Sequence, residues 1–418
     1  MRILYSILMY LTAAVLWLLQ FVSPKLKQFV RGRDGVYETL QKNRAPADRP
    51  IWFHCASLGE FEQGVPIMAA MRKKYPDRKI AVTFFSPSGY EIKKDTPLAD
   101  VVTYLPLDTP ANAAKFIEIL RPGLAIFIKY EIWPNYLREL DRKKIPALLV
   151  SGLFRENQLF FQPYGSFMRR ALHRFNHIFV QNEASENLLE KAGFTKVSIS
   201  GDIRFDRVSQ QIERANHLAF IEEFLKVDTQ EKPLCIVCGS TWAADEAVLL
   251  PYINRAPAHV KFVIAPHKID SARIAQLERQ LGVSNTRYTE RTGKNSSRSR
   301  VLIVDTIGLL TKIYSYADIA YVGGAMGSTG LHNILEPATF GVPVLIGKNF
   351  EEFPEARRLQ QLAGLYSVTG AGELSEIMAK LVSQKDFREK TGMIAGHFVN
   401  QNTGATRITM EYIAQLTF

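Results

Sequence analysis

Short apolar runs alternate with helical patterns along the chain from about residue 50 onward. The first six runs are rich in β-branched and aromatic residues: Ile51–Cys55, Ile80–Phe85, Val101–Leu105, Leu124–Ile128, Ala147–Val150 and His177–Gln181. Runs of this length, separated by helical patterns, are typical of strands in a parallel sheet that is covered on both faces. The first half of the chain is therefore predicted to form a doubly wound α/β sheet.

A second series of apolar runs predicts a second sheet of the same kind. It comprises Leu234–Gly239, Phe262–Ala265, Val301–Asp305, Ile319–Gly323 and Pro343–Ile346. The charged, helix-prone segment between the two series places the domain boundary near residues 205–231, and the polar stretch 293–300 is predicted to be an exposed loop. A length of 418 residues also favours two domains over one.

These patterns predict two Rossmann-like domains, with the first spanning residues 36–207 and the second residues 229–395. Residues 396–418 have helical periodicity and are expected to pack back on the first domain.

The N-terminal residues differ from the rest of the chain, because no charged side chain occurs from Ile3 to Val22. About twenty helical residues, each rising ~1.5 Å, are long enough to cross a hydrocarbon core of about 30 Å. A cleaved signal peptide is disfavoured, since Phe21–Pro24 offers no small-residue cleavage site. Residues 1–24 are therefore predicted to be a membrane anchor.

The charges that flank this segment predict its orientation. Only Arg2 precedes it, and four basic residues follow it: Lys25, Lys27, Arg31 and Arg33. The positive-inside rule then places the rest of the chain on the cytoplasmic side. A helix that lies in the membrane interface remains an alternative, because Tyr5, Tyr10 and Trp17 give the segment some amphipathic character.

The formal net charge of +11 favours an anionic partner. Nucleic acid is not the expected one, because the basic residues are scattered and no RNP, zinc-finger or helix-turn-helix signature occurs. The three cysteines, Cys55, Cys235 and Cys238, are too few for a disulfide framework. Cys235 and Cys238 are predicted to be small core residues of a strand, and no metal site is predicted.

The residues that follow the predicted strands carry the candidate chemistry of the first domain. Glu60 comes at the strand-to-helix turn after Ile51–Cys55, where a carboxylate can accept a proton from an attacking hydroxyl. A first-turn Glu that complements the helix dipole is the alternative. Glu131 follows Leu124–Ile128 in a turn with Trp133 and Pro134, where it serves either the site or the start of the next helix.

The second domain offers groups suited to phosphate and ribose. Gly239–Thr241 and Pro266–Lys268 follow strands and can present backbone N–H groups and a lysine to a phosphate. No Walker A lysine loop or G-x-G-x-x-G fingerprint occurs, which argues against a P-loop kinase and a nicotinamide dehydrogenase. Asn333 and Glu336 would share one face of a helix and meet a ribose edge, whereas His332 is expected to be structural.

Eight segments, in this order along the chain, resemble the 3-deoxy-D-manno-octulosonic acid (Kdo) transferases, which are glycosyltransferases of the GT-B class. The segments are Ala56–Glu60, Thr83–Glu91, Tyr104–Asp108, Glu131–Asn135, Gly201–Asp206, Gly239–Thr241, Asp305–Gly308 and His332–Ala338. The resemblance spans essentially the whole chain. It implies an α/β fold of the GT-B type, in which two Rossmann-like domains face a cleft, together with the N-terminal anchor helix.

The resemblance also implies roles for individual residues. Glu60 corresponds to the general base, Glu131 to a second carboxylate near the reacting centre, and Arg204 to a group that stabilises the transition state. The family usually has a lysine at the position of Arg204. The implied CMP-Kdo contacts are Gly239, Ser240, Thr241, Pro266, His267, Lys268, Ile307, Gly308, Leu309, Asn333, Ile334, Leu335 and Glu336. The implied acceptor contacts are Ser57, Gly59, Ser88, Gly89 and Arg155.

The implied reaction transfers Kdo from CMP-Kdo, with inversion, to the glucosamine disaccharide of a lipid A precursor such as lipid IVA. It needs no cofactor and no metal. The implied location is the cytoplasmic side of the inner membrane, with the membrane lipid as a further partner. The segment from Leu153 to Arg170 mixes aromatic and cationic residues, as either a membrane-facing patch or a core helix with surface arginines would.

Two other functions are compatible with the sequence. One is a GT-B enzyme, or a related epimerase, that uses a nucleotide-diphosphate sugar. The other is a non-catalytic, membrane-tethered binding module that exploits the positive charge.

Overall fold

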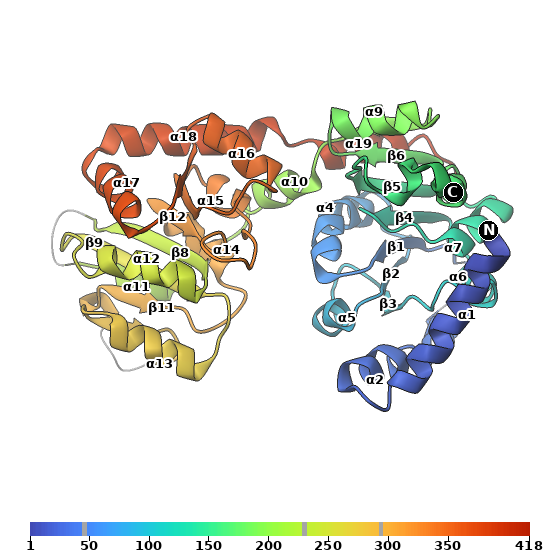
Figure 1. Cartoon of the computed structure of the whole chain (residues 1–418), viewed down its shortest axis with the longest axis horizontal. Helices are drawn as coiled ribbons and strands as arrows, with labels where there is room; N and C mark the ends of the chain where they lie inside the picture. The colour runs from blue at the N-terminus through green and yellow to red at the C-terminus, as the bar shows by residue number, and fades with distance from the viewer. Residues whose placement is uncertain (44–47, 228–231, 292–295) are drawn as a thin grey trace. The chain divides into compact units, whose positions relative to one another are not determined.

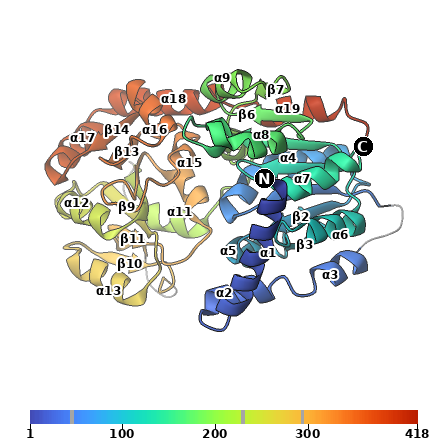
Figure 2. The ribbon, with the colours of Figure 1, turned by 45° about the vertical axis from the view of Figure 1, so that its right-hand side comes forward.

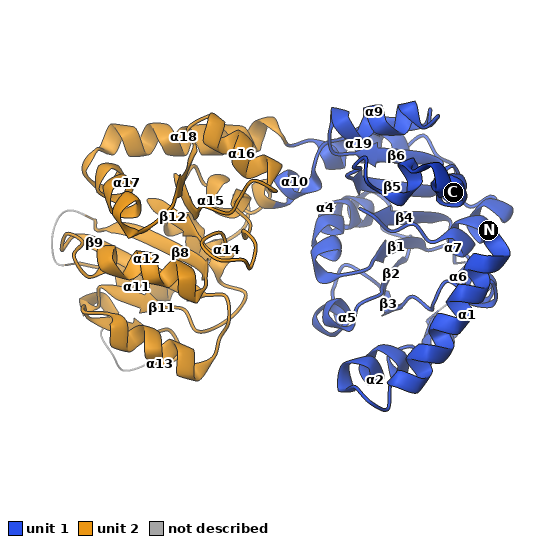
Figure 3. Cartoon of the chain, in the orientation of Figure 1, with its two compact units in different colours: residues 1–207, 403–418 blue, residues 208–402 orange. Residues whose placement is uncertain are grey.

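The computed structural model of the chain describes residues 1–43, 48–227, 232–291 and 296–418 (Figure 1). The chain divides into two compact units: residues 1–207 with 403–418, and residues 208–402 (Figure 3). Residues 228–231 of the predicted boundary and residues 293–295 of the predicted loop lie outside the described residues. The part of that loop that is described begins with a short 3-10 turn, η3 (Ser296–Arg298).

The described part of unit 1 contains a seven-stranded parallel sheet in the order β3-β2-β1-β4-β5-β6-β7. Its strands are β1 (Ile51–Cys55), β2 (Ile80–Phe84), β3 (Val101–Tyr104), β4 (Leu124–Ile128), β5 (Ala147–Gly152), β6 (His177–Val180) and β7 (Val197–Ile199). The central strands β1, β2 and β4 are buried along their whole length. This burial explains their continuous apolar runs, because helices cover both faces.

Helices connect these strands and complete the two outer layers of unit 1 (Figure 2). They are α3 (Val36–Lys42), α4 (Leu58–Lys74), α5 (Pro87–Lys93), α6 (Pro110–Leu120), α7 (Pro134–Arg142), α8 (Ser166–Leu172), α9 (Glu183–Lys191) and α10 (Ile203–Ser209), with the 3-10 turns η1 (Leu159–Phe161) and η2 (Pro163–Gly165). Side chains of β1 alternate between two cores, with Trp52 in one and Ile51 and Phe53 in the other. His54 therefore shares the face of Trp52.

The described part of unit 2 also contains a seven-stranded parallel sheet, in the order β10-β11-β9-β8-β12-β13-β14. Its strands are β8 (Leu234–Thr241), β9 (Val260–Pro266), β10 (Asn285–Arg287), β11 (Val301–Ile303), β12 (Ile319–Val322), β13 (Val344–Gly347) and β14 (Leu365–Val368). Cys235 and Cys238 are free, buried and on opposite faces of β8, which confirms the prediction that both are core residues. The predicted α/β class with two parallel sheets is confirmed.

The helices of unit 2 cover both faces of its sheet. They are α11 (Ala219–Leu225), α12 (Ala243–Ile253), α13 (Ser271–Gln280), α14 (Leu310–Ile313), α15 (Leu335–Ala338), α16 (Pro354–Gln361), α17 (Ala371–Ser383) and α18 (Lys385–Gln401), with the 3-10 turn η4 (Tyr314–Tyr316). Residue 396, where the C-terminal segment was expected to begin, lies within α18. The chain enters unit 1 only at Thr403.

The last helix, α19 (Ala405–Ile413), packs in unit 1. Asp206 holds its start, because the carboxylate accepts the backbone N–H groups of Gly404 at 2.6 Å and Thr406 at 2.5 Å. Tyr412 packs its ring on His177 of β6. A carboxylate at a helix N-terminus is favourable, so this aspartate fixes where the C-terminal helix docks.

The N-terminal helices α1 (Arg2–Leu19) and α2 (Pro24–Arg31) belong to unit 1 as well. By length and composition, α1 is the one helix among the described residues that could cross a membrane, and none of its residues is fully buried. Arg33 follows α2 and donates to the backbone oxygens of Leu105 and Phe85. This arginine was counted among the membrane-flanking charges, but its guanidinium is tied to the protein.

Candidate active site

Both sheets reverse their strand order at one place, and the predicted site residues gather there. In unit 1 the reversal lies between β1 and β4, and in unit 2 between β8 and β12. Ligands of open α/β sheets bind beyond the carboxyl ends of the strands at such a switch point. Glu60 and Glu131 follow the two strands of the first switch point. At the second, Asn333–Glu336 come after β12, but Gly239–Thr241 are the last residues of β8 itself, so the prediction that they follow the strand is wrong.

Glu60 is the third residue of α4, which begins at Leu58. Its carboxylate accepts the N–H of Ser57, and its own N–H bonds to the Ser57 hydroxyl, which together form a capping box. A simple cap would lower the pKa of a glutamate. Burial instead raises the pKa of Glu60 to about 7, with a further rise from the charge of Glu131. A carboxyl with this pKa can accept a proton near neutral pH.

Glu131 lies just beyond β4, and its carboxylate is held by two N–H donors. His54 Nε2 lies 3.1 Å and Trp133 Nε1 lies 2.7 Å from the same oxygen, Oε2. Only 12% of the Glu131 side chain is exposed. His54 is a site residue that sequence reasoning missed. The signal that could have found it is a histidine inside an otherwise apolar strand, on the strand that leads to Glu60.

The turn between β4 and Glu131 has an unusual backbone. Lys129 has a φ of 70°, a left-handed conformation that costs energy for a residue with a side chain. Tyr130 is the next residue, and the centre of its ring lies 5.2 Å from Lys129 Nζ. Such strain is often found at functional sites. The positive charge of Lys129 lowers the pKa of Glu60, in opposition to burial and Glu131.

Arg204 lies in α10 and pairs with Asp202, with Nη2 and Oδ2 2.7 Å apart. The charges of Arg204, Asp202 and Glu60 all act on the pKa of the Tyr130 hydroxyl. The predicted cation is anchored by an acid from its own motif. This anchor is a feature that sequence reasoning missed.

Of the residues predicted to contact the acceptor, Ser57, Gly59 and Gly89 lie at the start of α4. Gly89 is buried, and a Cβ there would lie 2.9 Å from the backbone nitrogen of Leu58, so only glycine lets α5 approach α4. Ser88 bonds to Ser86 through its hydroxyl. Gly59 is exposed in the first turn of α4, and Arg155 is exposed in the loop after β5.

Gly239, Ser240 and Thr241 form the irregular end of β8, where the backbone is strained in the same way as in the turn at Lys129. Ser240 has a φ of 54°, and the pairing of β8 with β9 shifts register there. A Cβ on Gly239 would overlap the hydroxyl of Tyr314, and one on Gly323 would overlap the backbone oxygen of Ser240. The backbone therefore approaches its neighbours so closely at Gly239 and Gly323 that only glycine fits at these two positions.

An aromatic stack lies beside the end of β8. It includes Trp242, a residue that sequence reasoning missed. His267 stacks on Trp242, with ring centres 4.5 Å apart, and lies 4.4 Å from the ring of His332. The indole N–H of Trp242 also donates to His332 Nε2 at 3.2 Å. Burial lowers the pKa of both histidines. His332 is held by its neighbours, as expected for a structural histidine.

Asn333 and Glu336 are close together, but not for the predicted reason. Helix α15 begins only at Leu335, so Asn333 precedes the helix instead of lying on its face. Its side chain accepts the N–H of Leu335 at 3.1 Å and contacts Glu336 Oε1 at 3.3 Å. The prediction that both residues lie on one helix is wrong, because the glycine-rich approach from Gly330 forms a turn before the helix. Ile307 is 83% exposed beside Gly308, whose φ is 86°.

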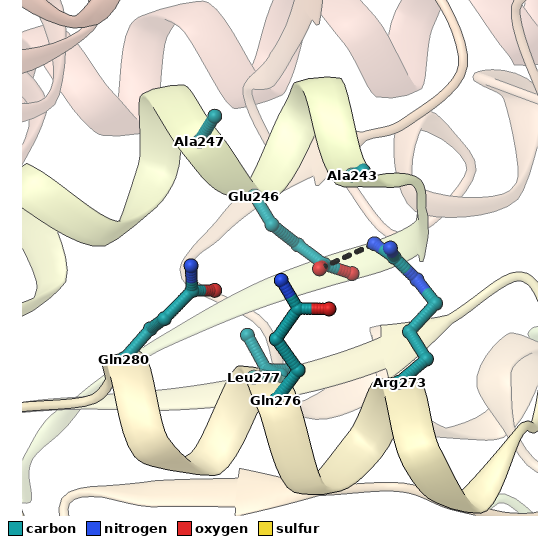
Figure 4. Close-up of a pocket in the computed structure, with 7 residues that line it drawn as sticks. All are labelled: Ala243, Glu246, Ala247, Arg273, Gln276, Leu277 and Gln280. Atoms are coloured by element: carbon teal, nitrogen blue, oxygen red, sulfur yellow. Dashed lines mark hydrogen bonds and ion pairs between the residues drawn. The ribbon is translucent and has the colours of Figure 1, made fainter.

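Two buried acids behind Gly239–Thr241 support the backbone. Asp245 accepts the N–H groups of Trp242 and Gly324 and the hydroxyl of Tyr321, each at 2.9 Å. Glu246 accepts the hydroxyl of Thr241 at 2.9 Å and pairs with Arg273 at 2.6 Å. Glu246 and Arg273 line a cavity of about 80 Å³ between α12 and α13 (Figure 4). This cavity therefore lies behind the end of β8, and its Glu246 carboxylate is used to hold Thr241.

A match to a protein family covers most of unit 1. The family described as 3-deoxy-D-manno-octulosonic-acid transferase (kdotransferase) has a model that matches residues 29–207.

Curated relatives match along almost the whole chain. A 3-deoxy-D-manno-octulosonic acid transferase of Haemophilus influenzae is 27% identical over 409 residues, which are 95% of this chain and 93% of the relative. The protein of the same name from Aquifex aeolicus is 25% identical over 361 residues, which are 84% of this chain and 92% of the relative.

The fold also resembles that of solved structures. UDP-GlcNAc 2-epimerase from Neisseria meningitidis, bound to UDP-GlcNAc, superposes with a TM-score of 0.63 at 16% identity. The match covers 88% of this chain and all of that chain. At this identity the likeness concerns the fold alone, which is GT-B-like.

Proposed function

We propose that the chain, which is similar to the 3-deoxy-D-manno-octulosonic acid transferases, is a glycosyltransferase of that family and transfers Kdo from CMP-Kdo to a lipid A precursor. The acceptor is the glucosamine disaccharide of lipid IVA, and the anomeric configuration is inverted. Glu60 is the general base of this reaction.

The observation that carries this proposal is the ionisation of Glu60. Its pKa of about 7 leaves part of the carboxyl ionised at neutral pH while keeping it basic enough to take a proton from a hydroxyl. A surface glutamate that only capped a helix would be a much weaker base. The nearby carboxylate of Glu131 maintains this property, because two like charges in a poorly solvated place disfavour each other.

In the proposed step, an acceptor hydroxyl oxygen forms a bond to the anomeric carbon of Kdo. The bond from that carbon to the phosphate oxygen of CMP breaks, and its electron pair leaves with the phosphate. The hydroxyl proton passes to Glu60. A single displacement of this kind inverts the anomeric centre, and CMP departs with the additional negative charge.

The remaining predicted residues have supporting roles in this proposal. The backbone N–H groups of Gly239–Thr241, with Lys268, meet the phosphate, where donors fixed in place stabilise the charge that develops. Asn333 and Glu336 bind the ribose of CMP. Arg204 compensates charge in the transition state, held in its orientation by Asp202.

We also propose that the protein is bound to the cytoplasmic face of the inner membrane, where the acyl chains of the acceptor lie. The contacts of α1 favour the interfacial alternative. Tyr5 donates its hydroxyl to the buried Asp108 at 2.8 Å, and its ring packs on Phe167 of α8. Both ends of α1 then stay with unit 1, and the exposed apolar residues of α1 enter one leaflet.

The aromatic and cationic segment from Leu153 to Arg170 has both buried and exposed parts. Phe154 is buried in the core, so that part is not membrane-facing. Leu159 and Tyr164 are exposed beside η1 and η2, close in sequence to the contact of Phe167 with α1. We propose that these two side chains extend the membrane-binding surface of α1.

The reaction is tested with the purified full-length protein, CMP-Kdo and lipid IVA in detergent, with mass spectrometry of the lipid product. A mass increase of one or more Kdo units is expected. A parallel reaction receives UDP-GlcNAc in place of CMP-Kdo. Turnover of the UDP-sugar without any Kdo product would refute the proposed donor.

The position of α1 is tested by cysteine labelling, because the three native cysteines are all buried. Arg2→Cys provides a single accessible thiol at the start of α1. A membrane-impermeant maleimide is expected to label it in inverted inner-membrane vesicles but not in spheroplasts. Labelling in spheroplasts alone would show that α1 crosses the membrane.

A further inference from the structure

A chain of buried polar side chains runs through the sheet of unit 1 to Glu131. The parallel register of β1 and β2 places His54 beside Thr83 and Trp52 beside Ala81. Trp52 Nε1 and His54 Nδ1 each lie 2.8 Å from the Thr83 hydroxyl oxygen. Trp52 and His54 have no exposed surface, and Thr83 has almost none. Each of these polar groups is therefore shielded from water. Burial of a polar group costs free energy unless the group forms a hydrogen bond within the protein.

The donors fix the direction of this chain. The indole N–H of Trp52 can only donate, so the Thr83 oxygen accepts from it. The single Thr83 proton then has two possible acceptors: the backbone oxygen of Phe53 at 3.4 Å and His54 Nδ1 at 2.8 Å. The shorter contact is the better hydrogen bond. His54 Nδ1 is therefore the acceptor, and Nε2 carries an N–H.

This tautomer directs an N–H at Glu131. His54 Nε2 lies 3.1 Å from Glu131 Oε2, which also accepts the indole N–H of Trp133. Two N–H groups therefore converge on one carboxylate oxygen and fix its position. The imidazole is enclosed by the rings of Trp52, Phe127 and Trp133, so it has little freedom to move.

We propose that His54, oriented by Thr83, is a positioning residue that holds the Glu131 carboxylate in the place from which its charge acts on Glu60. This inference rests on the proposed role of Glu60 as the base. His54 itself touches no reacting atom and takes no proton from the acceptor. The charges that act on Glu60 are those of Glu131, which raises its pKa, and Lys129, which lowers it.

A matched pair of variants separates the two ends of the imidazole. In His54→Gln the amide nitrogen occupies roughly the place of Nε2 and can still donate to Glu131. In His54→Asn the amide oxygen occupies roughly the place of Nδ1 and accepts the Thr83 hydroxyl, and no N–H reaches Glu131. Both variants are neutral and leave a similar gap in the core.

The experiment measures kcat for Kdo transfer from pH 5.5 to 9 and follows the titration of Glu60 by NMR of ¹³C-labelled glutamate, assigned with Glu60→Gln. For His54→Asn, kcat is expected to fall about tenfold to hundredfold. Its Glu60 titration moves to lower pH, because the Glu131 carboxylate is no longer held in place by His54 and its charge acts less on Glu60. For His54→Gln, kcat stays within about threefold of the wild type, and the titration stays in place.

Equal behaviour of the two variants, in rate and in titration, would overturn the proposal. If neither folds, Thr83→Val and Thr83→Ser take their place. Only Thr83→Val loses the hydroxyl that orients His54, and equal rates for this pair would also overturn the proposal. The NMR titration needs no transfer activity, so a wild-type protein without Kdo transfer would refute the proposed function while leaving the positioning of Glu131 open to measurement.

Discussion

Two acids occupy the same position in the two units and have opposite uses. Glu60 is the third residue of α4, which follows β1, and Asp245 is the third residue of α12, which follows β8. Each accepts the backbone N–H of the residue that precedes its helix. Asp245 is fully buried and accepts two further hydrogen bonds, from Gly324 and Tyr321. Glu60 is only partly buried and lies within range of a second negative charge.

The comparison shows that position in the fold does not make a base. An acid at the start of a helix is structural when donors saturate both of its oxygens, because ionisation is then favourable and permanent. The same position gives a proton acceptor when burial and a like charge outweigh the donors. Three predictions test this difference, in order of decreasing effect.

The largest effect is expected for Glu60→Gln. Glutamine can still cap α4, so the unfolding free energy should change by less than about 0.5 kcal/mol. Without the base, the rate of Kdo transfer should fall by about 10³-fold, within the usual range for general base catalysis. Initial rates and urea unfolding measure the two quantities.

Glu62→Gln is the matched control for this variant. Glu62 is in the same helix turn and forms ion pairs with Lys93 and Arg207, but it has no proposed part in the chemistry. Its rate should stay close to that of the wild type. A Glu60→Gln enzyme with more than a tenth of the wild-type rate would remove Glu60 as the base.

Asp245→Asn is expected to act on stability. The NH₂ group of the asparagine side chain cannot accept a hydrogen bond. At least one of the three buried groups that donate to Asp245 therefore loses its partner. The cost should be about 2–4 kcal/mol in unfolding free energy. Asp270→Asn is the control, because Asp270 caps α13 at an exposed position where asparagine is equally suitable. Equal unfolding curves for the two variants would show that Asp245 is not the support proposed here.

The smallest effect is a shift in pH dependence for Glu131→Gln. Glu60 must be ionised to accept a proton, so the rate should rise with pH through a midpoint near 7, its pKa. The charge of Glu131 raises that pKa, and its removal should move the midpoint to lower pH by up to about 1 unit. The ratio of the rate at pH 6 to that at pH 8 should therefore increase, even if the maximum rate falls. A midpoint that stays in place or rises would exclude coupling between the two carboxylates.

The strands that sequence patterns failed to predict are β7, β10 and β14, and all three are edge strands. Each has only three or four residues and is partly exposed, so it lacks the continuous apolar run that marks a strand buried on both faces. Central strands such as β1 and β4 were predicted with their exact bounds, because burial on both faces requires every residue to be apolar or to be satisfied internally.

The candidate site was only partly accessible from the sequence. Strand exits indicated Glu60 and Glu131, because ligands bind beyond the carboxyl ends of parallel strands. His54, Trp242 and Asp245 were missed, since each acts through a partner far away in the chain. The shared face of Asn333 and Glu336 was predicted from helical spacing, but a turn before α15 produces their contact instead.

The sequence by itself determined the two parallel sheets, the apolar N-terminal helix and the order of motifs that resembles the Kdo transferases. These properties follow from local patterns, since apolar periodicity and strand exits are encoded within a few consecutive residues. Only the tertiary structure decided which acid combines burial with a second negative charge and which is saturated by hydrogen-bond donors. Ionisation depends on burial and on charges brought close by strand pairing, and residues 54, 83 and 131 become neighbours only when the sheet forms.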